Sequence, residues 1–192
     1  LTLVGVIILC VKVNLLTAFL SLLTSFLYTL VYTPMKRISW FNTTIGAIPG
    51  AIPPMGGWAA ARGELGIEAW ILFAILFIWQ HPHFFAIAWI FKDDYRKAGF
   101  KMLPVVDPDG KSTFQQTIWF SALLILISLL PSMIGMAGRV YFWGALIAGI
   151  LLFQVGWQLR KSHSTADAYK LLKASVIYLP ILLFLIVFDV TF

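Results

Sequence analysis

Long apolar stretches separated by short charged loops constrain this chain more than any other feature of its sequence. Of its 192 residues, 60% are hydrophobic and 11% are charged, which is more apolar surface than a soluble domain of this size needs. A helical stretch of about 20 apolar residues matches one hydrocarbon thickness. The sequence therefore predicts an all-α, polytopic transmembrane helix bundle that forms a single domain over residues 1–192.

Seven hydrophobic segments are expected along the chain. The first is too short to cross a bilayer, so we interpret it as the end of a span truncated at its N-terminus. The third is rich in Gly and Pro, so we expect a broken helix there. The segments are residues 1–11, 15–32, 43–61, 69–91, 114–134, 141–159 and 174–191. We expect polar loops at residues 33–42 and 160–173, and a kink of the last span at Pro180.

The basic residues divide unequally between the two ends of such a bundle. If the segments alternate in direction, eleven of the fourteen Lys and Arg residues fall at one end. The other three are Lys12, Arg62 and Arg139. Because Lys and Arg accumulate in cytoplasmic loops, we expect the basic end in the cytoplasm and the spans in the lipid bilayer. The net charge of +6 is thereby explained by topology, and no nucleic-acid partner is expected.

A charged island at residues 92–110 holds four of the eight acidic residues. Asp93 and Asp94 are adjacent carboxylates, and Mg²⁺ prefers oxygen ligands of this kind together with phosphate oxygens. The basic residues of the island can stabilise phosphate charge directly. They are Lys92, Arg96, Lys97 and Lys101. The island suits a diphosphate group, and a solvated loop that touches anionic lipid headgroups remains the alternative. Asp107 and Asp109 lie in a VDPDG turn and are interpreted as structural.

Two histidines, His81 and His83, lie inside the fourth segment. Ionisable side chains at membrane depth usually face a cavity or a partner. Two positions apart on a regular helix, they point to nearly opposite faces, so we do not expect both to bind one metal ion. For each of them, a ligand-facing imidazole and an interhelical hydrogen bond remain equal alternatives.

Four stretches of the chain, in this order and spacing, resemble the haem branch of the UbiA superfamily of intramembrane prenyltransferases. They are YTPMKR (32–37), WFNTTIGAIPGAIPPMGGW (40–58), WQHPHFFAIAW (79–89) and KDDYRKAGFKMLPVV (92–106). The resemblance implies a bundle of nine helices around a central cavity, of which about seven are present here. It also implies transfer of a farnesyl group from farnesyl diphosphate to a vinyl group of protohaem IX (haem B), which gives haem O.

The resemblance further implies the residues of the site. Asp93 and Asp94 match the second of the two Asp-rich motifs that hold Mg²⁺ and diphosphate in this superfamily, with Lys92 and Arg96 as catalytic cations beside them. The implied substrate-binding residues are Lys36, Arg37, Asn42, Tyr95, Lys97, Lys101, His81 and His83. Among the histidines, His83 is preferred for contact with haem.

The first Asp-rich motif of the superfamily is absent, because no two Asp residues lie four positions apart. We therefore expect a fragment that is inactive by itself. Two other functions remain open. One is a UbiA-type transferase with a quinone or chlorophyllide acceptor, and the other is a transporter or non-catalytic membrane subunit, which a broken helix and buried histidines would suit.

Mg²⁺ is the expected cofactor, and haem B is expected as a substrate. Haem A synthase is a further partner that the resemblance implies. The expected location is the bacterial cell membrane, with the mitochondrial inner membrane as the alternative.

Overall fold

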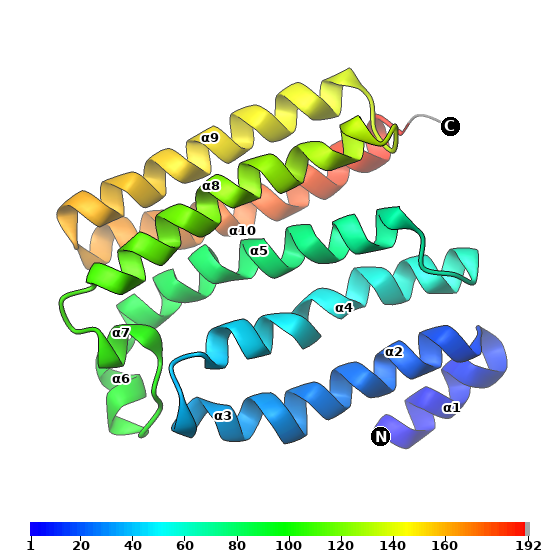
Figure 1. Cartoon of the computed structure of the whole chain (residues 1–192), viewed down its shortest axis with the longest axis horizontal. Coiled ribbons are helices and arrows are strands. Elements are labelled where there is room, and N and C mark those ends of the chain that lie inside the picture. Colours follow the sequence, from blue (N-terminus) through cyan, green and yellow to red (C-terminus); the bar gives the residue numbers. More distant parts are fainter. Residues whose placement is uncertain (191–192) are drawn as a thin grey trace.

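The computed structural model describes residues 1–190 as a bundle of long helices (Figure 1). In chain order the elements are α1 (Thr2–Lys12), α2 (Leu15–Phe26), the π-helical turn η1 (Leu27–Tyr32), α3 (Thr33–Ile38), α4 (Asn42–Arg62), α5 (Ile67–Ile90), α6 (Lys92–Lys97), α7 (Leu103–Val106), α8 (Lys111–Met133), α9 (Arg139–Ser162) and α10 (Thr165–Phe188). Five segments of the described chain are long and apolar enough to cross a membrane. They are Leu15–Ile38, Ile67–Ile90, Lys111–Met133, Arg139–Ser162 and Thr165–Phe188. The prediction of an all-α, multi-pass membrane protein is confirmed, while the predicted end of the last span at Thr191 lies outside the described residues.

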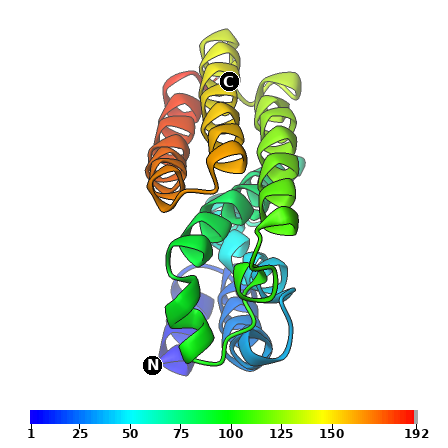
Figure 2. The same cartoon turned by 90° about the vertical axis from the view of Figure 1, so that its left-hand side faces the viewer.

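Helix α5 occupies the centre of the bundle and packs against α4 on one side and against α8 and α10 on the other. One hydrophobic core joins α5 to α8, α9 and α10. A second, smaller core joins α2 and α4 to the first turn of α5. Figure 2 shows these two groups as separate layers, with α5 between them.

The third segment, predicted to be broken at residues 43–61, is one continuous helix, α4. Its three prolines each remove a backbone donor, yet the helix is continuous and packs closely along α5, and neighbouring helices can support such helices in a membrane protein. Gln80 Nε2 donates to the carbonyl oxygen of Ala47 at 3.1 Å. A methyl group at Gly50 would overlap the Gln80 side chain, so this contact depends on the absence of a side chain there. The prolines are Pro49, Pro53 and Pro54.

Two predicted loops prove to be helical at their edges. The second span continues through η1 and α3 to Ile38, so Lys36 and Arg37 lie on its last turn rather than in a loop. The last helix begins at Thr165 and runs through Pro180, nine residues before the predicted start at Ala174. Hydropathy reports only the part of a helix that lies in hydrocarbon, and these helices extend beyond that part into the polar loops.

Successive long helices run in alternate directions, so the turns collect at two ends (Figure 1). The basic end holds the α3–α4 turn, the island and the α9–α10 turn, and with them eleven Lys and Arg and five Asp residues. The opposite end holds three basic and three acidic residues. The predicted division of the basic residues is confirmed, and the whole formal charge of +6 lies at the basic end.

Candidate active site

Two loops that are far apart in the sequence are joined by hydrogen bonds at the basic end. The backbone N–H of Lys101, in the island, donates to the carbonyl oxygen of Lys36 at 2.7 Å. The side chain of Asn42 donates from Nδ2 to the carbonyl oxygens of Ser39, at 2.7 Å, and Lys101, at 3.0 Å. These bonds hold the island against residues 36–42, which we call the α3–α4 corner.

The ammonium group of Lys36 lies among aromatic rings in this corner. Its Nζ is 4.5 Å from the ring centroid of Tyr32, 5.9 Å from that of Tyr28 and 6.0 Å from that of Phe100. The guanidinium carbon of Arg37 is also 6.0 Å from the Phe100 centroid. Aromatic faces attract cations, so Phe100 of the island links both basic side chains of the corner to the island.

Sequence reasoning missed Tyr32 and Phe100. Tyr32 lies four residues before Lys36 on one helix, which was a usable indication, since such residues share a helix face. Phe100 gave no such indication, because its place beside Lys36 depends on the hydrogen bond between the two loops.

The two adjacent carboxylates, Asp93 and Asp94, lie in the first turn of α6 and are exposed. Asp93 Oδ1 accepts a hydrogen bond from Arg96 Nη1 at 2.7 Å, with side chains 67% and 51% exposed, respectively. Exposed ion pairs of this kind contribute at most about 1 kcal/mol. The carboxylate of Asp94 forms no hydrogen bond or ion pair with residues 1–190. Both carboxylates therefore stay available to a ligand.

No group of three His, Cys, Asp or Glu side chains within residues 1–190 is placed to hold a metal ion. Asp93 and Asp94 by themselves supply few protein ligands. Mg²⁺, however, usually keeps several waters and binds through one or two carboxylates together with substrate phosphates. The pair therefore fits Mg²⁺ only when a diphosphate supplies the remaining oxygens.

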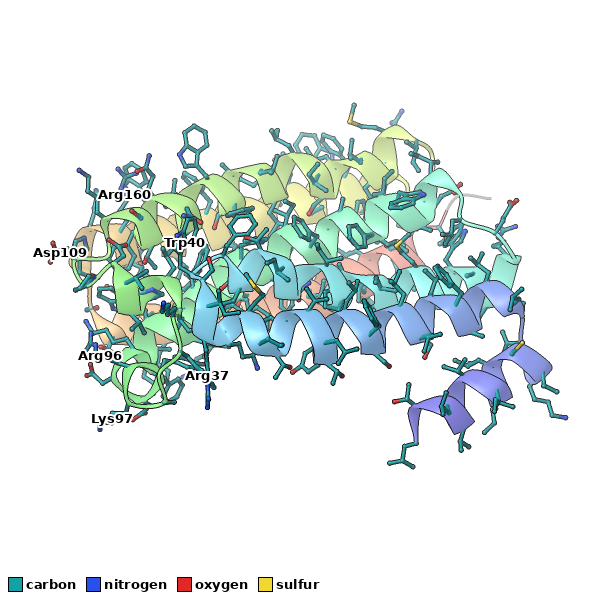
Figure 3. All side chains as sticks on the ribbon, turned by 60° about the horizontal axis from the view of Figure 1, so that its bottom comes forward. Arg37, Trp40, Arg96, Lys97, Asp109 and Arg160 are labelled. Carbon is teal, nitrogen blue, oxygen red and sulfur yellow. The ribbon has the colours of Figure 1, made fainter. Side chains whose placement is uncertain are left out.

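The remaining side chains of the island differ in their surroundings. Lys92 Nζ lies 4.3 Å from the ring centroid of Trp89, back toward α5. The ring of Tyr95 lies 6.1 Å from that of Phe100, and burial raises the pKa of the Tyr95 hydroxyl, so this group is a protonated donor at neutral pH. Figure 3 shows Arg37, Arg96 and Lys97 projecting from the basic end, where Asp109 and Arg160 also lie.

His81 and His83 lie apart from these residues, inside α5. His83 precedes Asp93 by ten residues, or about 15 Å along a helix. His81 is fully buried, and its ring stacks on Phe120 of α8 at 3.7 Å between centroids. Its Nδ1 lies 2.9 Å from the carbonyl oxygen of Phe77, and its Nε2 lies 3.2 Å from Thr44 Oγ1 on α4. Because a carbonyl oxygen only accepts, Nδ1 carries the proton and Nε2 accepts from the hydroxyl of Thr44.

His83 faces the other side of α5. Its Nδ1 lies 2.9 Å from Ser175 Oγ on α10, and its ring stacks on Trp79 at 4.7 Å between centroids. Ser175 Oγ donates its own proton to the carbonyl oxygen of Leu172 at 2.7 Å, so His83 Nδ1 is the donor to Ser175. The expectation that the two histidines face opposite sides is confirmed, and both form interhelical hydrogen bonds. His83 Nε2 has no hydrogen-bond partner within the described chain.

The fold and the site thus define a multi-pass membrane protein with exposed carboxylates and clustered cations at one end. The model of the UbiA prenyltransferase family matches residues 1–185, and the chain belongs to this family. A solved structure described as "Structural and mechanistic insights into the biosynthesis of Digeranylgeranylglyceryl phosphate synthase in membranes" has the same fold, with a TM-score of 0.79. That likeness covers 98% of this chain and 66% of the other at 20% identity.

Two relatives are much more similar in sequence. The chain is 47% identical over 189 residues to "Protoheme IX farnesyltransferase" of Solibacter usitatus (strain Ellin6076), covering 98% of this chain and 65% of the relative. It is 49% identical over 185 residues to the protein of the same name from Koribacter versatilis (strain Ellin345), covering 93% of this chain and 60% of the relative. The chain therefore spans less than two thirds of the length of these relatives.

Proposed function

We propose that this chain takes part in farnesyl transfer from farnesyl diphosphate to protohaem IX (haem B), which gives haem O. The observation that carries the proposal is its 47–49% identity to two relatives named for this activity, over 93–98% of its length. The chain supplies one carboxylate pair and the cations of the basic end. We expect full activity only together with the part of the relatives that it does not span, and we treat residues 1–192 as one domain of that enzyme.

The basic end is the proposed diphosphate site. Asp93 and Asp94 are the residues that would hold Mg²⁺ together with the diphosphate, and the ion would supply positive charge beside the leaving group. Lys36, Arg37 and Lys101, which the two loops bring together, bind phosphate oxygens directly. Each charge-assisted hydrogen bond of this kind contributes about 1.5–3 kcal/mol. The other cations assigned to phosphate are Lys92, Arg96 and Lys97.

The proposed reaction breaks the bond between the farnesyl carbon and the diphosphate oxygen and forms a carbon–carbon bond to the haem vinyl group. Water then adds to the resulting cation and a proton is released, so haem O and diphosphate are the products. The role of the chain is to stabilise the leaving diphosphate where its negative charge increases. The rings of Tyr28, Tyr32 and Phe100 lie around Lys36, and aromatic faces of this kind could also stabilise the farnesyl cation as it forms.

His83 is the proposed contact to haem. Its Nε2 has no partner in residues 1–190, whereas both ring nitrogens of His81 are engaged by Phe77 and Thr44. His81 therefore has a packing role in this proposal, contrary to its place among the expected substrate-binding residues.

The proposed location is a bacterial inner membrane, with the basic end in the cytoplasm. The eleven Lys and Arg residues gathered at that end support this orientation through the positive-inside rule. We also propose haem A synthase as a partner, because it would consume haem O. The transporter alternative loses its main support, since α4 is a continuous helix.

Membranes containing the protein, incubated with haem B, farnesyl diphosphate and Mg²⁺, test the proposal. The chain is assayed as it stands and joined to the segment of the Solibacter relative that lies outside the matched region. We expect haem O by mass spectrometry from the joined form, and none after Asp93→Ala/Asp94→Ala. Prenylation of another aromatic acceptor would assign the chain to a different branch of the family. No prenyl transfer at all would overturn the proposal.

A further inference from the structure

We propose that Asn42 is a positioning residue that clamps the island to the α3–α4 corner and thereby sets the spacing between the cations of the two loops. The family resemblance had implied a substrate-binding role for this side chain. The assignment of those cations to a diphosphate rests on the proposed function. The claim that Asn42 holds the island to the corner rests only on the observed hydrogen bonds.

The side chain of Asn42 is closed to a ligand. It is fully buried. An asparagine amide has two N–H donors, and here Nδ2 donates to two carbonyl oxygens, those of Ser39 and Lys101. Its Oδ1 lies 3.4 Å from Thr43 Oγ1, which donates to it. Both N–H donors of the amide are therefore used within the protein, and its oxygen lies in a fully buried side chain.

Both backbone polar groups of Lys101 are held by the α3–α4 corner. The N–H of Lys101 is bound to the corner through the carbonyl oxygen of Lys36 at 2.7 Å, and the carbonyl oxygen of Lys101 is bound to Asn42 at 3.0 Å. Phe100, the preceding residue, lies beside Lys36, Arg37 and Tyr95. Releasing Lys101 would therefore also displace the ring that links the basic side chains of the two loops.

The chain offers a matched control at the other end of the same helix. Asn14 donates from Nδ2 to the carbonyl oxygen of Ala59, in the last turns of α4, at 2.7 Å. Its Oδ1 accepts from the backbone N–H of Thr17 at 2.8 Å. Asn14 thus ties α2 to α4 as Asn42 ties the island to α4, but it does so at the opposite end, away from the island.

Hydrogen–deuterium exchange measured by mass spectrometry on the folded protein in lipid nanodiscs tests the clamp without any assay of activity. We expect Asn42→Ala to speed exchange of the Lys101 amide, and Asn14→Ala to leave it unchanged. Asn42→Leu keeps the number of side-chain heavy atoms and the branch at Cγ without any donor, so it should behave like Asn42→Ala. If Asn42→Ala does not fold, Asn42→Ser, which keeps one donor, should give an intermediate increase.

The kinetic consequence is measured in the joined, active form. A displaced Lys101 loses a charge-assisted hydrogen bond to the diphosphate, so we expect Asn42→Ala to raise KM for farnesyl diphosphate about tenfold or more, with a smaller change in kcat. Unchanged exchange at Lys101 in Asn42→Ala, or an equal increase in Asn14→Ala, would overturn the clamp. Faster exchange without haem O formation by the unmodified protein would keep the clamp and reject the proposed function.

Discussion

The two ends of the bundle use carboxylates in different ways. At the opposite end, Asp189 Oδ2 accepts a hydrogen bond from the backbone N–H of Tyr141 at 2.7 Å, which caps the start of α9. A methyl group at Gly138 would approach this half-buried carboxylate to within 2.8 Å, so the carboxylate lies directly against the residue that precedes α9. At the basic end, Asp93 has one exposed ion pair, and Asp94 has no partner in residues 1–190.

The hydrogen-bond partners of a carboxylate distinguish a structural Asp from one that is open to a ligand, whereas its position in the sequence does not. Asp107 belongs to the island but is structural, as expected, because its Oδ2 accepts from the backbone N–H of Thr113 at 2.8 Å and from Thr113 Oγ1 at 2.9 Å. A carboxylate that caps a helix stabilises the fold, while an exposed and unpartnered carboxylate beside a cluster of cations is available for ligand binding.

The largest effect is expected from the double substitution Asp93→Ala/Asp94→Ala. It removes both oxygen donors proposed for Mg²⁺ and makes few changes to packing, because both side chains are exposed. We predict a fall in haem O formation of at least about a thousandfold, measured by mass spectrometry, with thermal stability unchanged. A fall in haem O formation of less than tenfold would mean that the exposed carboxylates of the basic end are not needed for the reaction.

A smaller effect is expected from Lys36→Ala, with Lys12→Ala as its control at the opposite end. Loss of one charge-assisted hydrogen bond to a phosphate removes about 1.5–3 kcal/mol, or roughly a 10- to 150-fold fall in kcat/KM for farnesyl diphosphate. Steady-state kinetics should show no change for Lys12→Ala. Equal losses in both variants would mean that the division of charge between the ends has no bearing on substrate binding.

Asp189→Ala is expected to change stability and leave activity intact. Removing a helix-capping acceptor usually lowers the free energy of unfolding by about 0.5–2 kcal/mol. Unfolding of the protein in mixed micelles measures this change, and kcat/KM should stay within twofold of the unmodified protein. A loss of activity comparable to that of the Asp93→Ala/Asp94→Ala variant would contradict a purely structural role for this carboxylate.

The smallest effect is expected from Ser164→Ala, a structural change within the basic end. Ser164 Oγ accepts from the backbone N–H of Asp167 at 3.1 Å and caps α10. We predict a loss of about 1 kcal/mol in the free energy of unfolding, without a change in KM. A raised KM would show that the α9–α10 turn also contributes to the substrate site.

The spans were predictable because a membrane places a strong and simple requirement on hydropathy. The early start of α10 was missed because it depends on the capping bond from Asp167 to Ser164, which hydropathy does not report. The continuity of α4 was missed because Gly and Pro content reports local preference, whereas α4 is packed along α5 in the folded chain. In both cases local composition indicated a loop or a break, and the folded chain forms a helix.

The candidate site was predictable to the same extent. Asp93 and Asp94 were selected from the sequence because they are adjacent and lie among cations, and the structure places both of them exposed in the first turn of α6; their role in ligand binding stays a prediction. The burial of Asn42 and the position of Phe100 were not predictable, because both depend on the contact of Lys101 with Lys36, 65 positions apart in the printed sequence. Clustered charges form a pattern that is visible in the sequence, whereas the residues that join the α3–α4 corner to the island are identified only in the folded chain.

Calorimetric titration of the joined protein with farnesyl diphosphate, with and without Mg²⁺, tests the central claim most directly. We predict binding that requires Mg²⁺, that is lost in Asp93→Ala/Asp94→Ala, and that persists in Asp189→Ala. Binding that is unaffected by Asp93→Ala/Asp94→Ala, or that Asp189→Ala abolishes equally, would contradict the assignment of the diphosphate site to the basic end.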